Sequence, residues 1–172
     1  MKKILRYTLI ALAVLLVVIQ FIRPEKNLSG DETNGIAAKY PVPADVQAVL
    51  KVACNDCHTN KTEYPWYAGV QPFAWWIGNH IEDGKRHLNF SDFTSRRIAI
   101  QNHKLEEVID EVKEHEMPLA SYTWIHRDAV LSDAQRELLI SWAEGIMDNL
   151  KATYPPDSLV MPKRGPRPPG RD

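Results

Sequence analysis

The two cysteines of this 172-residue chain stand three positions apart, and a histidine directly follows the second one. The segment reads Cys54-Asn55-Asp56-Cys57-His58, a Cys-x-x-Cys-His pattern. Two thiols about one helical turn apart can add to the two vinyl groups on one edge of a porphyrin, and the adjacent histidine then lies under the ring, where it can ligate iron. The spacing therefore predicts one covalently attached haem, with Cys54 and Cys57 as attachment residues and His58 as an axial ligand.

Three other kinds of site also use a pair of cysteines. A thioredoxin-like redox site has a βαβ surround, and the sequence predicts no strand before Cys54. A structural zinc site requires four ligands, and His80 and His87 have the wrong spacing to complete one. A plain disulfide is compatible with an exported protein but gives no role to His58. The sequence favours haem over all three.

The sixth iron position has a candidate in Met117, which lies 59 residues after His58 and is followed by Pro118. A thioether ligand stabilises reduced iron, as expected for an electron carrier. The alternative is that Met117 is an apolar contact where a helix ends. Five histidines are rival ligands: His80, His87, His103, His115 and His126. The strongest rival is His115, because it is nearest to Met117. A carbonyl near Pro65 is expected to accept a hydrogen bond from the free ring nitrogen of His58.

The first 23 residues predict a membrane anchor. Residues 7–22 are uncharged and mainly apolar, and four cations flank them: Lys2, Lys3, Arg6 and Arg23. A cleaved signal peptide is the alternative, but the only Ala-x-Ala sequence that could mark its cleavage lies inside the apolar run. By the positive-inside rule the basic flank stays in the cytoplasm. We therefore expect a single transmembrane helix in a bacterial inner membrane, with the rest of the chain in the periplasm.

The remaining chain shows helical rather than strand periodicity. Apolar residues recur at spacings of three and four in three stretches: 43–53, 72–87 and 104–115. Each is expected to be a helix, the second with Phe73 and Trp76 buried. Residues 132–135, Ser-Asp-Ala-Gln, form a capping-box pattern that opens a last helix. The chain is thus predicted to be all-α.

Composition divides the chain into four parts. Residues 1–23 form the anchor, 24–42 a tether, 43–151 the haem domain and 152–172 a tail with six of the twelve prolines, which is expected to be disordered. The formal net charge of −1 conceals an acidic middle, because residues 24–151 carry a net charge of −7 and both ends are basic. An acidic body argues against nucleic-acid binding, which requires a basic surface.

Taken together, these motifs resemble the bacterial haem-binding domain family, which comprises membrane-anchored relatives of cytochrome c. The resemblance covers about residues 40–150. It is carried by CNDCHTN (54–60), YPWY (64–67), VQP (70–72) with WW (75–76), HLNF (87–90), EMPL (116–119) with SY (121–122), and LSDAQR (131–136). The resemblance implies a cytochrome c-like helical domain around a covalently attached haem, in which the helix before the attachment site packs across the C-terminal helix. It does not imply a particular partner or reaction.

The expected function is transfer of single electrons by a membrane-anchored periplasmic protein that carries one haem c. Its partners would be redox proteins in or near the membrane, and it is expected not to be an enzyme. The chain offers no second cofactor motif, no phosphate-binding glycine loop and no nucleophile–base pair. The alternative is a haem-based sensor or a small peroxidase with an open sixth position, in which His80 or His115 could act as the distal base.

Overall fold

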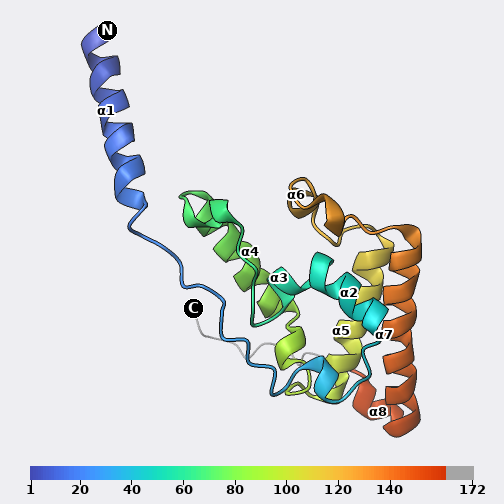
Figure 1. Cartoon of the computed structure of the whole chain (residues 1–172). Coiled ribbons are helices and arrows are strands. Elements are labelled where there is room, and N and C mark those ends of the chain that lie inside the picture. Colours follow the sequence, from blue (N-terminus) through green and yellow to red (C-terminus); the bar gives the residue numbers. More distant parts are fainter. Residues whose placement is uncertain (162–172) are drawn as a thin grey trace, which may run out of the picture.

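Helices form all the regular secondary structure of residues 1–161, the part of the chain that this computed structural model describes (Figure 1). No strand occurs in this range, which confirms the all-α prediction. The α-helices are α1 (Lys2–Ile19), α2 (Ala44–Ala53), α3 (Asn55–His58), α4 (Phe73–His87), α5 (Ile98–Lys113), α6 (Ala120–Thr123), α7 (Asp133–Thr153) and α8 (Pro156–Leu159). Short 3₁₀ turns connect them: η1 (Ile36–Ala38), η2 (Trp66–Gly69), η3 (Phe90–Asp92) and η4 (Arg127–Ala129).

The core lies between α5 and α7, which run side by side (Figure 1). Leu105 of α5 and Leu139 and Leu150 of α7 are at most 1% exposed. Burying each leucine contributes about 1.5–3 kcal/mol relative to leaving it in water. The two helices therefore form the stable centre of the domain, and the shorter elements pack against them.

Helix α7 begins where the sequence predicts. The hydroxyl of Ser132 accepts a hydrogen bond from the backbone N–H of Gln135 (3.3 Å), and Oε1 of Gln135 accepts one from the backbone N–H of Ser132 (2.9 Å). These reciprocal bonds satisfy amide groups that the first turn of a helix leaves free. The capping-box prediction is confirmed, and the first turn of α7 is fixed beside the 116–131 segment.

Helix α2, which leads into the cysteine motif, packs across α7. It buries Val46, Val49 and Leu50 in the same core. Just before α2, the carbonyl of Pro41 accepts a hydrogen bond from the indole N–H of Trp142 in α7 (3.1 Å). The helix before the motif thus lies across the C-terminal helix, as the family resemblance implies.

Helix α4 packs directly on the short helix α3. It buries Ala74 and Ile81, and a Cβ added at Gly84 would lie 2.8 Å from the carbonyl oxygen of Cys57. Phe73 and Trp76, which are expected to be buried, are instead 52% and 41% exposed. That expectation is wrong because α4 turns the face with Ala74, Ile81 and Gly84, rather than its aromatic face, toward the domain.

Residues 24–42, predicted to be a tether, make specific contacts with the domain. The backbone N–H of Thr62 donates to the carbonyl of Asn27 (3.0 Å). The side chains of Ile36 and Tyr40 are buried in the main core. This stretch therefore folds onto the domain that follows it, although it forms only one turn of 3₁₀ helix.

The beginning of the predicted disordered tail, 152–172, has a defined structure. Helix α7 continues to Thr153, and α8 packs against α5. The hydroxyl of Tyr154 accepts a hydrogen bond from Nζ of Lys39 (3.1 Å). The rest of the predicted tail, residues 162–172, lies outside the described part of the chain.

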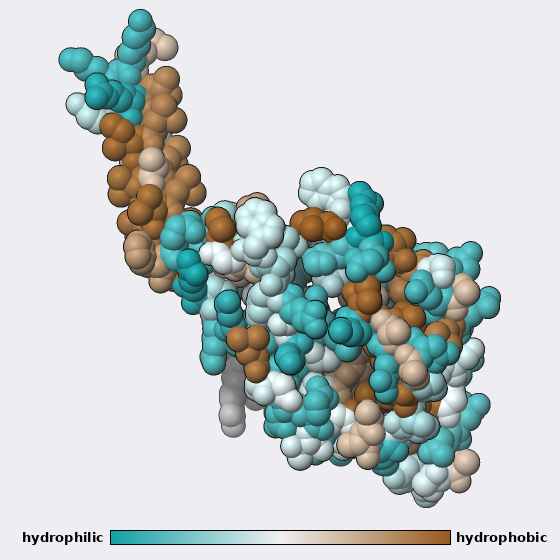
Figure 2. All heavy atoms as spheres, in the orientation of Figure 1, coloured by the Kyte–Doolittle hydropathy of each residue, from teal (hydrophilic) through white to brown (hydrophobic). Residues whose placement is uncertain are grey.

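Helix α1 projects from the body as a column of exposed apolar side chains (Figure 2). It has 18 residues, and Lys2, Lys3 and Arg6 occupy its first turns. No helix within residues 1–161 is both long and apolar enough to cross a membrane. The predicted transmembrane helix is therefore not supported, because these charges shorten the apolar part of α1.

A substitution at Gly84 tests the close packing of α4 on α3. The added Cβ of Gly84→Ala would meet backbone atoms of Cys57, which cannot move aside as the end of a flexible side chain can. We expect the free energy of unfolding, measured by chemical denaturation, to fall by roughly 1–3 kcal/mol. Gly145→Ala in α7 is the matched control, since nothing lies within 4 Å of its Cβ position, and it should raise that free energy by about 0.5–1 kcal/mol. Equal effects of the two substitutions would contradict the packing.

Candidate functional site

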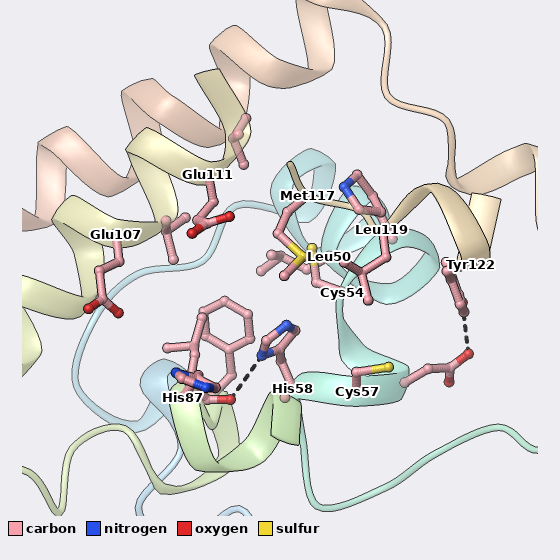
Figure 3. A pocket seen from close by; sticks show the side chains of 18 of the residues that line it. Leu50, Cys54, Cys57, His58, His87, Glu107, Glu111, Met117, Leu119 and Tyr122 are labelled. Atoms are coloured by element: carbon pink, nitrogen blue, oxygen red, sulfur yellow. Dashed lines mark hydrogen bonds between the residues drawn. The ribbon is translucent and has the colours of Figure 1, made fainter. Parts of the chain in front are cut away.

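A cavity of about 550 Å³ lies between α2, α3, α4, α5 and the segment that joins α5 to α6. Such a volume falls within the roughly 300–1,000 Å³ typical of sites for small molecules and cofactors. The four residues that the sequence predicts for the site all line this cavity: Cys54, Cys57, His58 and Met117 (Figure 3). The fold thus brings Met117 to the cysteine motif across 59 residues of sequence.

The walls of the cavity are mainly apolar. They include Leu50, Ala53, Leu88, Phe90, Val108, Val112 and Leu139. Charged side chains also line it, among them Glu107 and Glu111 of α5, which lie on the side away from Cys57 (Figure 3). A largely apolar chamber with a few polar groups suits a large, flat, apolar cofactor, because most of the surface of such a group must be removed from water.

Cys54 and Cys57 are placed by a break between two helices. Cys54 ends α2 and precedes α3, with φ −127° and ψ −41°. Its carbonyl accepts hydrogen bonds from the backbone N–H groups of Cys57 (3.2 Å) and His58 (3.0 Å). The motif is therefore a single turn of helix, which holds the two thiols one turn apart and the imidazole directly after the second.

Burial raises the pKa of both thiols, that of Cys54 to about 12 and that of Cys57 to about 11. The neighbouring carboxylate of Asp56 adds to the shift at Cys57. Both cysteines are free and protonated at neutral pH. Cysteine pairs that exchange disulfides work as thiolates with a lowered pKa, so this environment disfavours the thioredoxin-like alternative.

The ring of His58 is oriented by a backbone carbonyl. Its Nδ1–H donates a hydrogen bond to the carbonyl oxygen of Leu88, at the end of α4 (3.0 Å). Burial lowers the pKa of His58 and favours the neutral imidazole. The other ring nitrogen is turned toward the cavity (Figure 3). The acceptor is thus Leu88 rather than a carbonyl near Pro65, and the bond leaves Nε2 available as a metal ligand.

Met117 is held by the ends of α5 and α7. Its backbone N–H donates to the carbonyl of Glu111 (3.1 Å), and its own carbonyl accepts a bond from Nη1 of Arg136 (3.5 Å). Arg136 also donates to the carbonyl of Val112 (3.0 Å). The side chain of Met117 points into the cavity from the side opposite His58 and α3 (Figure 3). Hydrogen bonds to α5 and α7 therefore fix the backbone of Met117, and this fixes the position from which its sulfur enters the cavity.

The rival histidines divide into two groups. His80 and His87 line the cavity, while His103, His115 and His126 do not. Nδ1 of His80 donates to the carbonyl of Trp76 (2.8 Å), so its other ring nitrogen is the one available for a ligand. His115, the strongest rival in sequence terms, is exposed and takes a left-handed backbone conformation (φ 63°) just after α5.

A link that the sequence does not reveal joins the Met117 segment to the cysteine motif. The hydroxyl of Tyr122 in α6 donates to Oδ2 of Asp56 (2.9 Å). The ring of Tyr122 stacks on His126 (centroids 4.2 Å apart, planes 5° apart), and His126 is hydrogen-bonded to Tyr67 (3.0 Å). A sequence signal for this pair would have been hard to find, since Tyr122 and Asp56 lie 66 positions apart. The contacts hold the segment 118–126 over one side of the cavity.

Comparison with known proteins agrees with this geometry. Residues 14–145 match the model of the haem-binding domain family, a range that begins inside α1 and therefore extends upstream of the expected 40–150. No curated protein and no solved structure matches the chain. The apolar cavity, the paired thiols and the oriented imidazole fit the group that this family binds. The chain belongs to the haem-binding domain family, and the protein is a haem-binding protein.

Proposed function

We propose that the protein holds one haem covalently through Cys54 and Cys57 and carries single electrons. The observation that supports this most directly is the orientation of His58. Its Nδ1 is engaged by the Leu88 carbonyl at 3.0 Å, and Nε2 is left to face the cavity that both thiols line. In a histidine fixed in this way only Nε2 is free to bind a metal, and the orientation of the ring sets the direction of its lone pair.

The cysteine turn would make the attachment. Each S–H adds across one vinyl C=C, so that one C–S bond and one C–H bond form and no oxidant or reductant is consumed. The contribution of the chain is position, because the bonds within the 54–58 turn keep the two sulfurs at a fixed separation. Burial of both thiols also keeps them protonated and protects them from oxidation before attachment.

His58 and Met117 are the proposed axial ligands. When bound, haem would supply an iron that changes its charge by one, and a thioether ligand favours the reduced form. The two ligand side chains reach the cavity from different halves of the domain, His58 from α3 and Met117 from the segment after α5. Because each is held by backbone hydrogen bonds, the site should reorganise little between oxidation states.

A haem-based sensor or small peroxidase is the second candidate function. His80 favours it, since this histidine lines the same cavity and its Nδ1 is already bonded to Trp76. An imidazole so placed could act as a base beside an open sixth position. The two functions differ in whether Met117 occupies that position.

The proposed location is the periplasmic side of a bacterial inner membrane, with α1 associated with the bilayer. The apolar side chains of α1 from Leu9 to Val18 are exposed, and protein atoms do not cover them. Lys2, Lys3 and Arg6 precede this stretch, where cations favour contact with anionic lipid headgroups. Redox proteins in or near the membrane are the proposed partners, and the acidic body does not favour nucleic acid.

Replacing the cysteines tests the covalent attachment. Cys54→Ala and Cys57→Ala should each weaken covalent retention of haem, and the double variant should abolish it, because the chain has no other cysteine. The measurement is a haem stain after denaturing electrophoresis. Asn55→Ala, in the same turn, is the control and should retain the stain. Covalent haem on the double variant would contradict the assignment.

Met117→Ala tests the sixth ligand. Loss of the sulfur should remove the weak long-wavelength charge-transfer band of the oxidised protein, allow the reduced protein to bind CO and lower the reduction potential. Met161→Ala, at an exposed methionine outside the cavity, is the control and should change none of these. Met117→His should restore six-coordination at a lower potential. An unchanged spectrum in Met117→Ala would transfer the assignment to His80 or His87.

Tyr122→Phe tests whether the link to Asp56 positions Met117. The substitution removes the hydrogen bond to the Asp56 carboxylate, worth roughly 1.5–3 kcal/mol, and the longer contact of the same hydroxyl with the carbonyl of Val52 (3.3 Å), while the ring can remain stacked on His126. We expect CO to compete with Met117 more readily, with little change in the spectrum without CO. Tyr154→Phe removes a hydroxyl bonded to Lys39, away from the cavity, and should leave CO binding unchanged. Identical CO binding in both variants would show that the Asp56 bond does not position Met117.

A further inference from the structure

One end of the body exposes an unusual number of large apolar side chains. They lie on two segments, one from η2 into α4 and one at α6, and we call them the aromatic face: Trp66, Val70, Phe73, Trp76, Leu119, Trp124 and Ile125. Trp66 is 85% exposed and Trp124 74% exposed. Large apolar surfaces of this kind usually mark a site of interaction with another molecule or with lipid.

The two segments form one surface. A small cavity of about 60 Å³ lies between them and is lined by Tyr67 and Trp76 on one side and by Ile125 and His126 on the other. The hydrogen bond between Tyr67 and His126 (3.0 Å) crosses this boundary. Leu119 lines both this cavity and the larger one that holds the cysteine motif. The aromatic face therefore lies beside the proposed haem site.

The aromatic face is formed by stretches without formal charge. Residues 64–81 and 117–126 contain no Asp, Glu, Lys or Arg, whereas such residues make up 25% of the whole chain. The rest of the body is acidic and would be repelled by anionic lipid headgroups. An uncharged surface rich in tryptophan has no such repulsion, and tryptophan prefers the headgroup level of a bilayer.

Helix α1 leaves the body at this same end (Figure 1). The side chain of Gln20 accepts a hydrogen bond from the backbone N–H of Gln71, between η2 and α4 (2.9 Å). The side chain of Gln71 in turn donates to the carbonyl of Ile22 (2.6 Å). Pro24 packs closely on Gly78 of α4, where an added Cβ would lie 3.1 Å away. The apolar helix and the aromatic face are thus held in a defined mutual position.

We propose that the aromatic face docks on the headgroup region of the lipid bilayer with which α1 associates. This inference rests on the proposed membrane association of α1. The aromatic side chains insert at the level of the headgroups, and α1 provides the deeper apolar contact. The domain would then have a fixed orientation on the membrane, with the haem cavity close to the lipid surface and within reach of partners embedded in it.

Photo-crosslinking of the full haem-loaded chain tests the orientation. The protein is bound to vesicles of phosphatidylethanolamine and phosphatidylglycerol that contain a lipid with a diazirine in its headgroup, and adducts are mapped by mass spectrometry. Adducts are expected in residues 64–77 and 117–126, and none in residues 98–113 of α5. A chain that floats with the vesicles but carries adducts only in residues 1–23 would overturn the docking and leave the association of α1 intact. A chain that does not float would overturn both.

Substitution of the two most exposed tryptophans gives a second readout. In the full chain, Trp66→Ser combined with Trp124→Ser should weaken partition into the same vesicles by about tenfold, since both rings lose their contact with lipid. Val160→Ser combined with Met161→Ser alters exposed apolar residues beyond α8 and should leave partition unchanged. Unchanged partition of the tryptophan variant, together with loss of a dimer on sedimentation, would overturn the proposal and assign the face to self-association.

Discussion

The close contact between α4 and α3 is the constraint on which the rest of the site depends. Gly84 has no side chain, so α4 can approach the carbonyl of Cys57 to a distance that any Cβ would prevent. One turn further along, the carbonyl of Leu88 reaches Nδ1 of His58. The same helix end therefore both presses against the cysteine turn and orients the imidazole. If α4 lay farther away, the His58 ring would lose its acceptor and its direction.

The side of the cavity that carries Met117 is held in place by different elements. Met117 is fixed from α5 and α7 through Glu111 and Arg136, and these helices owe their position to the leucine core rather than to the cysteine turn. The bond from Tyr122 to Asp56 then joins the two halves across the cavity. This division would suit the two proposed axial ligands, because separate elements hold His58 and Met117 and the packing of the whole domain sets the distance between them.

Sequence reasoning succeeded where the determining interactions are local. The cysteine turn spans five residues and the capping box of α7 spans four, so each can be recognised without knowing the fold. It placed the distant Met117 at the same cavity as the cysteine motif, but it failed for two other long-range contacts. The acceptor of His58 is Leu88, 30 positions away, and nothing near Pro65 distinguishes the wrong carbonyl from the right one. The packing of 24–42 on the domain likewise depends on long-range bonds that composition does not encode.

The error about α4 has a different cause and bears on function. Helical spacing correctly shows that Phe73 and Trp76 share a face with other apolar residues, but α4 has apolar residues on more than one side. Packing on α3 requires the side with Ala74, Ile81 and Gly84, since only a glycine at position 84 allows the close approach to Cys57. The aromatic side is then left in water, at a cost of roughly 25 cal/mol for each Å² of apolar surface. The core uses only one apolar side of α4, so the exposed aromatic side is available for contact with another molecule. Its position beside the end of α1 is the reason for proposing that this contact is with lipid.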